Sequence, residues 1–296
     1  MTEIENIRHA QRQRLQFIES VAFWEGEIDR PRVCKVFHVS ENHVTRDFRL
    51  YRQSFPENLD YDITSRVYRP SREFRPQIAS GRPEEYLSLL RSYTESQSAA
   101  LVPAIGQGVR SASLPAPNGQ IEPEVLFLVT RAIKRRQGLS IQYQSLNTPH
   151  PTCRMVWPHA LICADFRWRI RVFDGKHGKY LDLVLTRILN ASPTKEALPA
   201  ETEKDAEWEN AVLVEITPFA GLSRDQKRVV GMEYGMTQKE SGWIWSISMR
   251  ECLIPYFLRV HRLDLDDPAA AFPIALADPE LAKQFRFPPI AAAQQE

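Results

Sequence analysis

The chain has 296 residues, of which 43% are hydrophobic and 25% charged, and its formal net charge is +1. This length exceeds that of one ordinary domain and predicts two or three, and the composition is that of a folded rather than a disordered protein. Residues 1–14 are polar and charged, and no apolar run approaches the ~18 residues of a membrane span. Neither a signal peptide nor a membrane anchor is expected, and the sequence favours a cytoplasmic protein.

The four cysteines lie far apart and lack the C-x-x-C spacing of zinc sites and small disulfide frameworks. Reduced thiols in apolar surroundings are the simpler interpretation. The sequence contains no Walker loop, H-E-x-x-H pattern or Ser-His-Asp order. We therefore expect no cofactor, no metal and no enzymatic activity, and an Mg²⁺-dependent nuclease is the least favoured alternative.

Residues 1–75 are predicted to form a winged helix-turn-helix domain. Apolar residues recur at helical spacing in three successive segments, and the third begins after a short break at His38-Val39 with Ser40 as its N-cap, accepting a backbone N–H bond. The inner face of this third helix is formed by Val44, Phe48 and Tyr51, at positions i, i+4 and i+7. Two short strands around residues 62–65 predict a β-hairpin, which would be the wing.

With its apolar face turned inward, the third helix presents hydrogen-bond donors and cations outward. The expected DNA contacts are Ser40, Asn42, His43, Thr45, Arg46, Arg49 and Arg52 from the helix, and Arg66 and Tyr68 from the wing. The first turn of such a helix reads base edges in the major groove, whereas later arginines suit phosphates or a guanine. The alternative is a solvated helix face with salt bridges, which the accompanying turn, cap and wing make less favoured.

Residues 76–122 contain many prolines and are predicted to be a linker with one helix, from Glu84 to Ser96. Residues 123–195 are predicted to be a second domain, in which a helix from Pro123 to Gln137 precedes a set of strands. The expected strands are Ser140 to Leu146, Arg154 to Cys163, Arg167 to Asp174 and Tyr180 to Ile188. Short strands joined by turns predict a small antiparallel β-barrel, similar to an SH3 barrel.

Arginine alternates with apolar residues along one of these strands. Trp168, Ile170 and Val172 are expected to face the core, and the three intervening arginines to share the opposite face. Arginines in one row repel one another unless an anion binds over them. The residues expected to form this cluster are Arg167, Arg169 and Arg171 with Tyr143, Ser145, His159 and Arg187. The cluster suits a phosphate or nucleotide, and the alternative is the exposed polar face of a half-buried sheet, with Tyr143 in the core.

A polar, acidic segment over residues 193–207 separates this domain from a third one, predicted over residues 205–266 with mixed helices and strands. The expected strands are Ala211 to Thr217 and Trp243 to Met249, and the expected helices are Arg224 to Tyr234 and Arg250 to His261. Residues 267–296, rich in alanine and proline, are expected to be a tail that is either loosely packed or bound along the surface of a partner. The fold class is therefore α+β with several domains.

Several short motifs now resemble a known family. They are Ile141-Gln142-Tyr143-Gln144-Ser145, Trp157-Pro158-His159-Ala160-Leu161, Phe166-Arg167-Trp168-Arg169-Ile170-Arg171, Val184-Leu185-Thr186-Arg187-Ile188, Pro218-Phe219, Leu222-Ser223 and Gly235-Met236, with Trp208, Gln226 and Tyr256. Together with the helix-turn-helix, they resemble the WYL-domain transcriptional regulators, and especially the BrxR and CapW repressors of anti-phage defence islands. The Trp-Tyr-Leu triplet that names the family is Trp168-Arg169-Ile170 here, and an arginine common early in the last strand is Leu181.

This resemblance implies an Sm-like β-barrel sensor and a C-terminal dimerisation domain. It also implies a homodimer that represses a defence operon until a ligand, a nucleotide or nucleic acid, releases it. The family's ligand pocket would correspond to Tyr143, Ser145, His159, Arg167, Trp168, Arg171 and Arg187.

We expect a homodimeric repressor on double-stranded operator DNA with an inverted repeat, whose half-sites lie about 34 Å apart or a multiple of that distance. Two alternatives remain open. One is a transcriptional activator with the same DNA contacts. The other is a nucleic-acid-binding accessory subunit of a defence complex.

Overall fold

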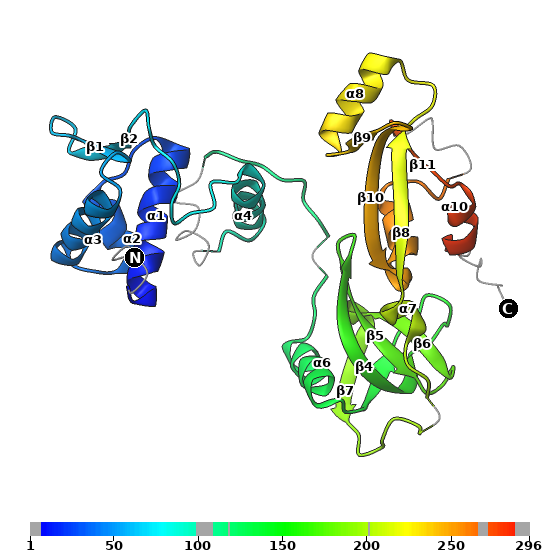
Figure 1. Ribbon diagram of the computed structural model, residues 1–296. Helices are drawn as coiled ribbons and strands as arrows, with labels where there is room; N and C mark the ends of the chain where they lie inside the picture. Colours follow the sequence, from blue (N-terminus) through cyan, green and yellow to red (C-terminus); the bar gives the residue numbers. More distant parts are fainter. Residues whose placement is uncertain (1–6, 99–108, 118, 201, 266–271, 288–296) are drawn as a thin grey trace. The chain divides into compact units, whose positions relative to one another are not determined.

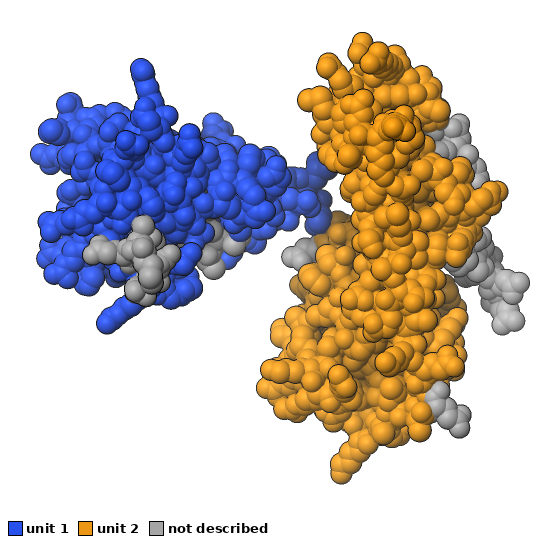
Figure 2. Space-filling view, viewed as in Figure 1, with its two compact units in different colours: residues 1–116 blue, residues 117–296 orange. Residues whose placement is uncertain are grey.

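The structure is a computed structural model that describes residues 7–98, 109–117, 119–200, 202–265 and 272–287. The chain divides into two compact units, Met1–Ala116 and Pro117–Glu296 (Figure 2). The first unit contains the predicted winged helix-turn-helix. The second contains both the predicted β-domain and the predicted third domain.

The first unit follows the predicted order of helices and hairpin (Figure 1). Its elements are α1 (His9–Glu25), α2 (Arg30–Phe37), α3 (Glu41–Ser54), β1 (Leu59–Asp62), β2 (Val67–Pro70) and α4 (Pro83–Ser96). Helix α2 begins where the Asp29 carboxylate accepts the backbone N–H of Arg32 (2.8 Å), and it ends at His38, whose φ of 52° is left-handed. The turn after His38 leads directly into α3, as the sequence predicts.

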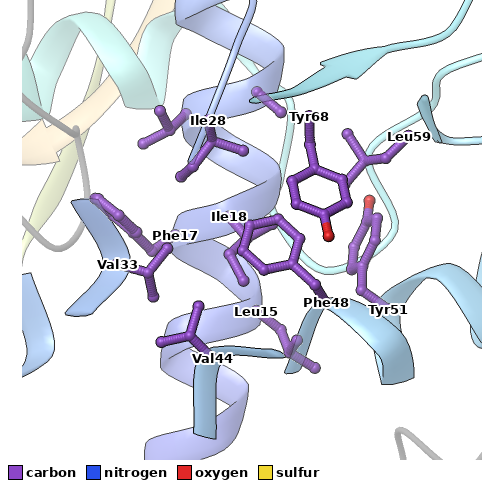
Figure 3. Close-up of a cluster of buried hydrophobic side chains, with 12 residues drawn as sticks. Leu15, Phe17, Ile18, Ile28, Val33, Val44, Phe48, Tyr51, Leu59 and Tyr68 are labelled. Atoms are coloured by element: carbon purple, nitrogen blue, oxygen red, sulfur yellow. The ribbon is translucent and has the colours of Figure 1, made fainter. Parts of the chain in front are cut away.

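The core of this unit is made by the apolar faces of α1, α2, α3 and the wing (Figure 3). Its fully buried side chains include Leu15, Ile18, Val33, Val44, Phe48 and Tyr51. The ring of Phe48 stacks on that of Tyr68, with centroids 4.0 Å apart, and thereby joins α3 to the wing. Burial of these faces is what fixes α3 in orientation, since a helix this short is not stable alone.

A buried carboxylate attaches the start of the linker to this core. Glu19 of α1 is 0% exposed and accepts the Tyr51 hydroxyl at 2.6 Å. It also accepts three consecutive backbone N–H groups, those of Gln77 (2.8 Å), Ile78 (2.7 Å) and Ala79 (2.5 Å). These four donors offset the cost of burying the charge.

The second unit begins with α6 (Pro123–Arg135), which packs against a five-stranded antiparallel sheet. The strands are β3 (Leu139–Tyr143), β4 (Thr152–Ala164), β5 (Arg167–Asp174), β6 (Lys179–Val184) and β7 (Ile188–Pro193), and their order is β6-β5-β4-β3-β7. The sequence predicts four of these strands but merges β6 with the start of β7. A short 3₁₀ turn, Leu185–Arg187, separates the two.

The predicted closed barrel is not found. Strands β6 and β7 are the two edges of the sheet, and no pairing joins them among the described residues. Because only the turn Leu185–Arg187 connects Val184 to Ile188, the two edges approach within about 14 Å at that corner. The sheet is therefore strongly curled but open.

The third domain is built on a second antiparallel sheet, of order β11-β8-β10-β9. Its elements are α7 (Ala206–Glu209), β8 (Ala211–Pro218), α8 (Arg224–Glu233), β9 (Thr237–Lys239), β10 (Gly242–Arg250), the 3₁₀ turn Glu251–Leu253, α9 (Ile254–Val260), β11 (Ile274–Leu276) and α10 (Glu280–Phe285). The expectation of a loose tail after residue 267 is wrong for the described part of that segment. Strand β11 pairs with β8, and its Ile274 is 0% exposed, so this segment completes the sheet.

No helix among the described residues is long and apolar enough to cross a membrane.

Candidate DNA interface and ligand-sensing region

Helix α3 separates a buried face from a cationic one. Val44, Phe48 and Tyr51 are at most 1% exposed. The predicted DNA contacts Ser40, Asn42, His43, Arg46, Arg49 and Arg52 are all exposed, and Thr45 is half-buried beside them. Ser40 occupies the predicted N-cap position, but the prediction that its side chain accepts a backbone N–H is wrong for the residues that the structure describes. Its hydroxyl instead lies 2.7 Å from Nδ1 of His43. The structure therefore places the whole predicted set from α3 on one accessible surface.

The acidic residue in the middle of α3 does not oppose this charge from the surface. Asp47 is 1% exposed, and its carboxylate accepts hydrogen bonds from Arg14 of α1 at 2.6 Å and from the Gln11 amide at 2.9 Å. Arg46, Arg49 and Arg52 make no ion pair with a carboxylate in the part of the chain that the structure describes. The outer face of α3 consequently carries three uncompensated positive charges.

A hollow of about 430 Å³ lies between α3 and the wing. It is lined by Arg30, Thr45, Phe48, Arg49, Arg52, Gln53, Pro56 and Tyr68. The Arg30 guanidinium donates to the Tyr68 hydroxyl at 2.9 Å, and this hydrogen bond raises the pKa of Arg30. The buried Nε of Arg30 has no hydrogen-bond partner among the described residues. Three guanidinium groups around one hollow form an arrangement suited to a phosphate.

Sequence reasoning missed Arg30 as a site residue and placed Tyr68 wrongly. The Tyr68 ring is only 4% exposed and belongs to the core, so it holds Arg30 rather than lying on the DNA-facing surface. Arg66 lies at the hairpin turn, where its φ of 59° is left-handed. Its side chain is exposed, as a residue of the wing must be to contact DNA. The signal for Arg30 was its charge in the first turn of the helix that precedes α3.

On the sheet, Arg169 and Arg171 of β5 are buried instead of exposed. Arg171 is 3% exposed and is surrounded by three carboxylates of the chain itself. Its contacts are to Asp205 (2.7 and 2.9 Å), Glu207 (2.6 Å) and Asp182 (3.2 Å). The anion that the arginine row was predicted to need is supplied by the protein.

The charges in this cluster are strongly coupled. Burial alone would lower the pKa of Arg171, but its hydrogen bonds to Asp205 and Glu207 outweigh that effect and raise the pKa. Burial opposes ionisation of Asp205 too, yet its hydrogen bond with Arg171 lowers its pKa below the ordinary value. For Asp182, burial dominates and raises the pKa. The pair of Arg171 and Asp205 is therefore the firmly ionised centre of the cluster.

The other predicted ligand residues do not gather around Arg171. Arg169 is 5% exposed, donates to the Ala164 carbonyl at 2.8 Å, and places its guanidinium 4.3 Å from the ring of Tyr256 in the third domain. Trp168, expected in the core, is 48% exposed. Tyr143 is 4% exposed, and its hydroxyl accepts the backbone N–H of Val184. Three further residues are half-buried at other places: Arg167 at the start of β5, Ser145 in the loop after β3 and Arg187 in the 3₁₀ turn.

His159 is the predicted residue that does join Arg171. It lies at an irregularity in the pairing of β4 with β5, and its Nε2 is 2.9 Å from the Asp205 carboxylate. Its ring also meets those of Tyr180 (5.5 Å) and Trp208 (5.4 Å) edge to face. Sequence patterns did not indicate Asp205, because it belongs to a polar segment outside the strands.

Comparison with known proteins assigns the three parts of the chain. Residues 10–92 match the BrxR transcriptional regulator winged helix-turn-helix domain, residues 124–193 the WYL domain, and residues 211–281 the BrxR C-terminal dimerization domain. The fold and these matches define a DNA-binding transcriptional regulator of the winged helix-turn-helix class.

Within that class, the chain belongs to the WYL-domain transcriptional regulators and is similar to the BrxR and CapW repressors. It is 28% identical to the DNA-binding transcriptional repressor CapW of Escherichia coli, over 85% of this chain and 82% of that protein. It is 27% identical to proteins of the same name from Stenotrophomonas maltophilia, over 94% and 93% of the two chains, and from Pseudomonas aeruginosa, over 89% and 86%.

The structure of the proteasome accessory factor PafBC of Arthrobacter aurescens aligns with 93% of this chain and 47% of that chain, at 16% identity. The TM-score of this alignment is 0.26, which does not establish a shared overall fold.

Proposed function

We propose that this chain is a homodimeric repressor that binds an inverted repeat in operator DNA and is released by an anionic ligand at its WYL domain. The observation that carries the proposal is the outer face of α3, where Arg46, Arg49 and Arg52 are exposed without acidic partners. The names of the similar CapW proteins, DNA-binding transcriptional repressors, support the same direction of regulation. A regulator of this kind acts in the cytoplasm, where the chromosome lies.

The two ends of α3 would have different tasks. Asn42 and His43 lie in the first turn, where base edges are read, whereas Arg49 and Arg52 line the hollow that Arg30 shares and suit the DNA backbone. Base contacts carry sequence specificity, and phosphate contacts carry affinity that falls with salt. One helix thus provides both.

A mobility-shift titration on DNA from upstream of the chain's own gene tests this division. N42A should reduce the preference for the native sequence over scrambled DNA. R52A should weaken binding to both DNAs alike and reduce the slope of log affinity against log salt by about 1. Equal affinity of the unmodified protein for native and scrambled DNA at physiological salt would remove the proposal of an operator.

Dimer formation and the regulated genes complete the proposal. The match to a dimerization domain supports a dimer, and two copies of α3 would then meet two half-sites. The resemblance to BrxR and CapW supports a phage-defence operon as the target. Deletion of the gene should raise transcription of the genes directly downstream, and a fall in their transcription would favour an activator instead.

A further inference from the structure

We propose that residues 203–208, the strap, act as an internal competitor for the ligand of the WYL domain, a ligand that combines an aromatic ring with an anionic group. This inference rests on the proposed function, in which such a ligand releases the repressor. While the strap is bound to the sheet, the Asp205 carboxylate occupies the position that the ligand's anionic group takes once the strap has dissociated.

The contacts of Asp205 are those of a bound anion. One oxygen accepts Nε of Arg171 at 2.7 Å and the other accepts a terminal nitrogen of Arg171 at 2.9 Å, which is the bidentate geometry of arginine with a carboxylate or phosphate. His159 approaches the first oxygen at 2.9 Å. Asp205 itself is 6% exposed, so the site it fills is closed to solvent.

The charge balance makes occupation by the strap and by an anionic ligand mutually exclusive. Three carboxylates surround the guanidinium of Arg171, and each of its three nitrogens already donates to one of them. Asp182 is fixed on β6, where it accepts the Tyr256 hydroxyl at 2.9 Å. Asp205 and Glu207 lie outside the sheet, on the strap. An added anion is repelled while these two carboxylates are bound, and after they depart it meets an arginine that still contacts Asp182 but has two nitrogens open to a new partner.

Two hollows lie on either side of the strap. One, of about 550 Å³, reaches Arg171, and the other, of about 590 Å³, reaches Trp157 and His159. Both are lined by Phe173, Tyr180, Lys204 and Asp205. The strap therefore divides one concave surface, and its departure would join an aromatic floor to the Arg171 site. The rim of the second hollow carries Arg136 and Lys204 as cations and Glu209 as an anion.

An aromatic ring with an attached anion fits this combined surface. The side chains of Trp157, Phe173 and Tyr180 offer stacking partners that tolerate many planar rings. Arg171 and His159 would take the anion. The ligand and the strap compete for these two side chains, so a ligand that binds only the released state shifts the population toward that state.

Release of the strap would also affect a contact with the dimerisation domain. The strap ends at Trp208, whose ring lies 4.2 Å from the guanidinium of Arg250 on β10 and whose carbonyl accepts a hydrogen bond from the same arginine. Loss of Asp205 from its site removes the anchor that precedes this contact. The sensor sheet and the third domain are thereby coupled through one short segment.

Calorimetric titration with adenosine 5′-monophosphate, adenosine and inorganic phosphate tests the competition. D205N keeps an N-capping oxygen for α7 but loses the charge, so it should bind adenosine 5′-monophosphate at least tenfold more tightly than the unmodified chain. The matched control is E196Q, which removes an exposed carboxylate from the same polar segment of the chain at a position that lines neither hollow. It should bind like the unmodified chain.

A gain of affinity cannot result from misfolding. For the opposite outcome, a circular dichroism spectrum and thermal transition of D205N like those of the unmodified chain show that the variant is folded. Equal affinity of D205N and the unmodified chain, or no binding of any probe to D205N, overturns the proposal. If phosphate alone binds D205N as tightly as the nucleotide, the aromatic part of the proposal is wrong.

Trypsin cleavage after the exposed Lys204 provides a second measurement on the unmodified chain. The nucleotide should accelerate this cleavage at least severalfold because it displaces the strap, and protection of Lys204 by the nucleotide would contradict displacement. Mobility shifts on the same samples separate this test from that of the proposed function. A chain that binds the nucleotide competitively but no DNA would refute the repressor while leaving the strap in place.

Discussion

The arginines of α3 and those of β5 look alike in the sequence and differ completely in the structure. On α3, Arg46 and Arg49 are exposed and make no ion pair with the described carboxylates, whereas on β5, Arg169 and Arg171 are 5% and 3% exposed and fully engaged. An unpaired surface arginine costs little and is free to bind a phosphate, but a buried one must be compensated within the fold. A basic run in a sequence therefore indicates a binding surface only when nothing covers it.

The largest expected effect is on stability, when the buried Arg171 and the exposed Arg49 are replaced by the same residue. R171M leaves the buried Asp182 and Asp205 without their cation and should lower the free energy of unfolding by about 3–5 kcal/mol. R49M, the same substitution on α3, should change it by no more than about 0.5 kcal/mol. Urea denaturation of both variants measures the difference. Comparable losses in the two would mean that the α3 arginine is structural as well.

A smaller effect on stability but a clear effect on DNA affinity is expected for Arg46, one of the exposed arginines of α3. R46A should leave stability unchanged and reduce affinity for the native upstream sequence about 5- to 150-fold, which corresponds to the ~1–3 kcal/mol of a good arginine–base contact. Scrambled DNA should lose less. The measurement is a mobility-shift titration at fixed salt, and a loss confined to low salt would assign Arg46 to the backbone instead.

A smaller effect on DNA binding is expected at Arg30, which combines features of the exposed and the buried arginines. Arg30 is half-buried and held by the Tyr68 hydroxyl, but it faces the hollow next to Arg49 and Arg52. Y68F preserves the ring packed on Phe48 and removes only the hydrogen bond, so all DNA sequences should bind a few-fold more weakly with an unchanged salt slope. R30Q should reduce that slope by about 1. A salt slope in R30Q equal to that of the unmodified chain would place no phosphate at Arg30.

The sequence predicted the first unit well because its signals are local. Spacing identified the buried Val44, Phe48 and Tyr51, and the break at His38 located the turn. Those features need only neighbouring residues along one helix. The exposed face of α3 followed from its buried face.

The sequence predicted the ligand region poorly because its geometry depends on distant segments. Alternation along β5 placed Ile170 and Val172 correctly in the core, but it could not show that residues 203–208 and Tyr256 cover the opposite face. Nor could it show that Trp168, the second residue of the strand, is 48% exposed although it alternates with the buried Ile170 and Val172. Periodicity reports which residues share a face and is silent on what packs against it.

The buried Glu19 has a consequence for how the first unit is joined to the rest of the chain. Because its carboxylate takes donors from both Tyr51 of α3 and the backbone of Gln77 to Ala79, these residues cannot separate without stranding a charge away from water. The chain stays attached beyond Ala79 as well, because the ring of Tyr86 in α4 stacks on that of Trp24 in α1, with centroids 4.8 Å apart. A displacement of residues 77–79 would therefore be transmitted through these hydrogen bonds to α3, the helix proposed to contact DNA.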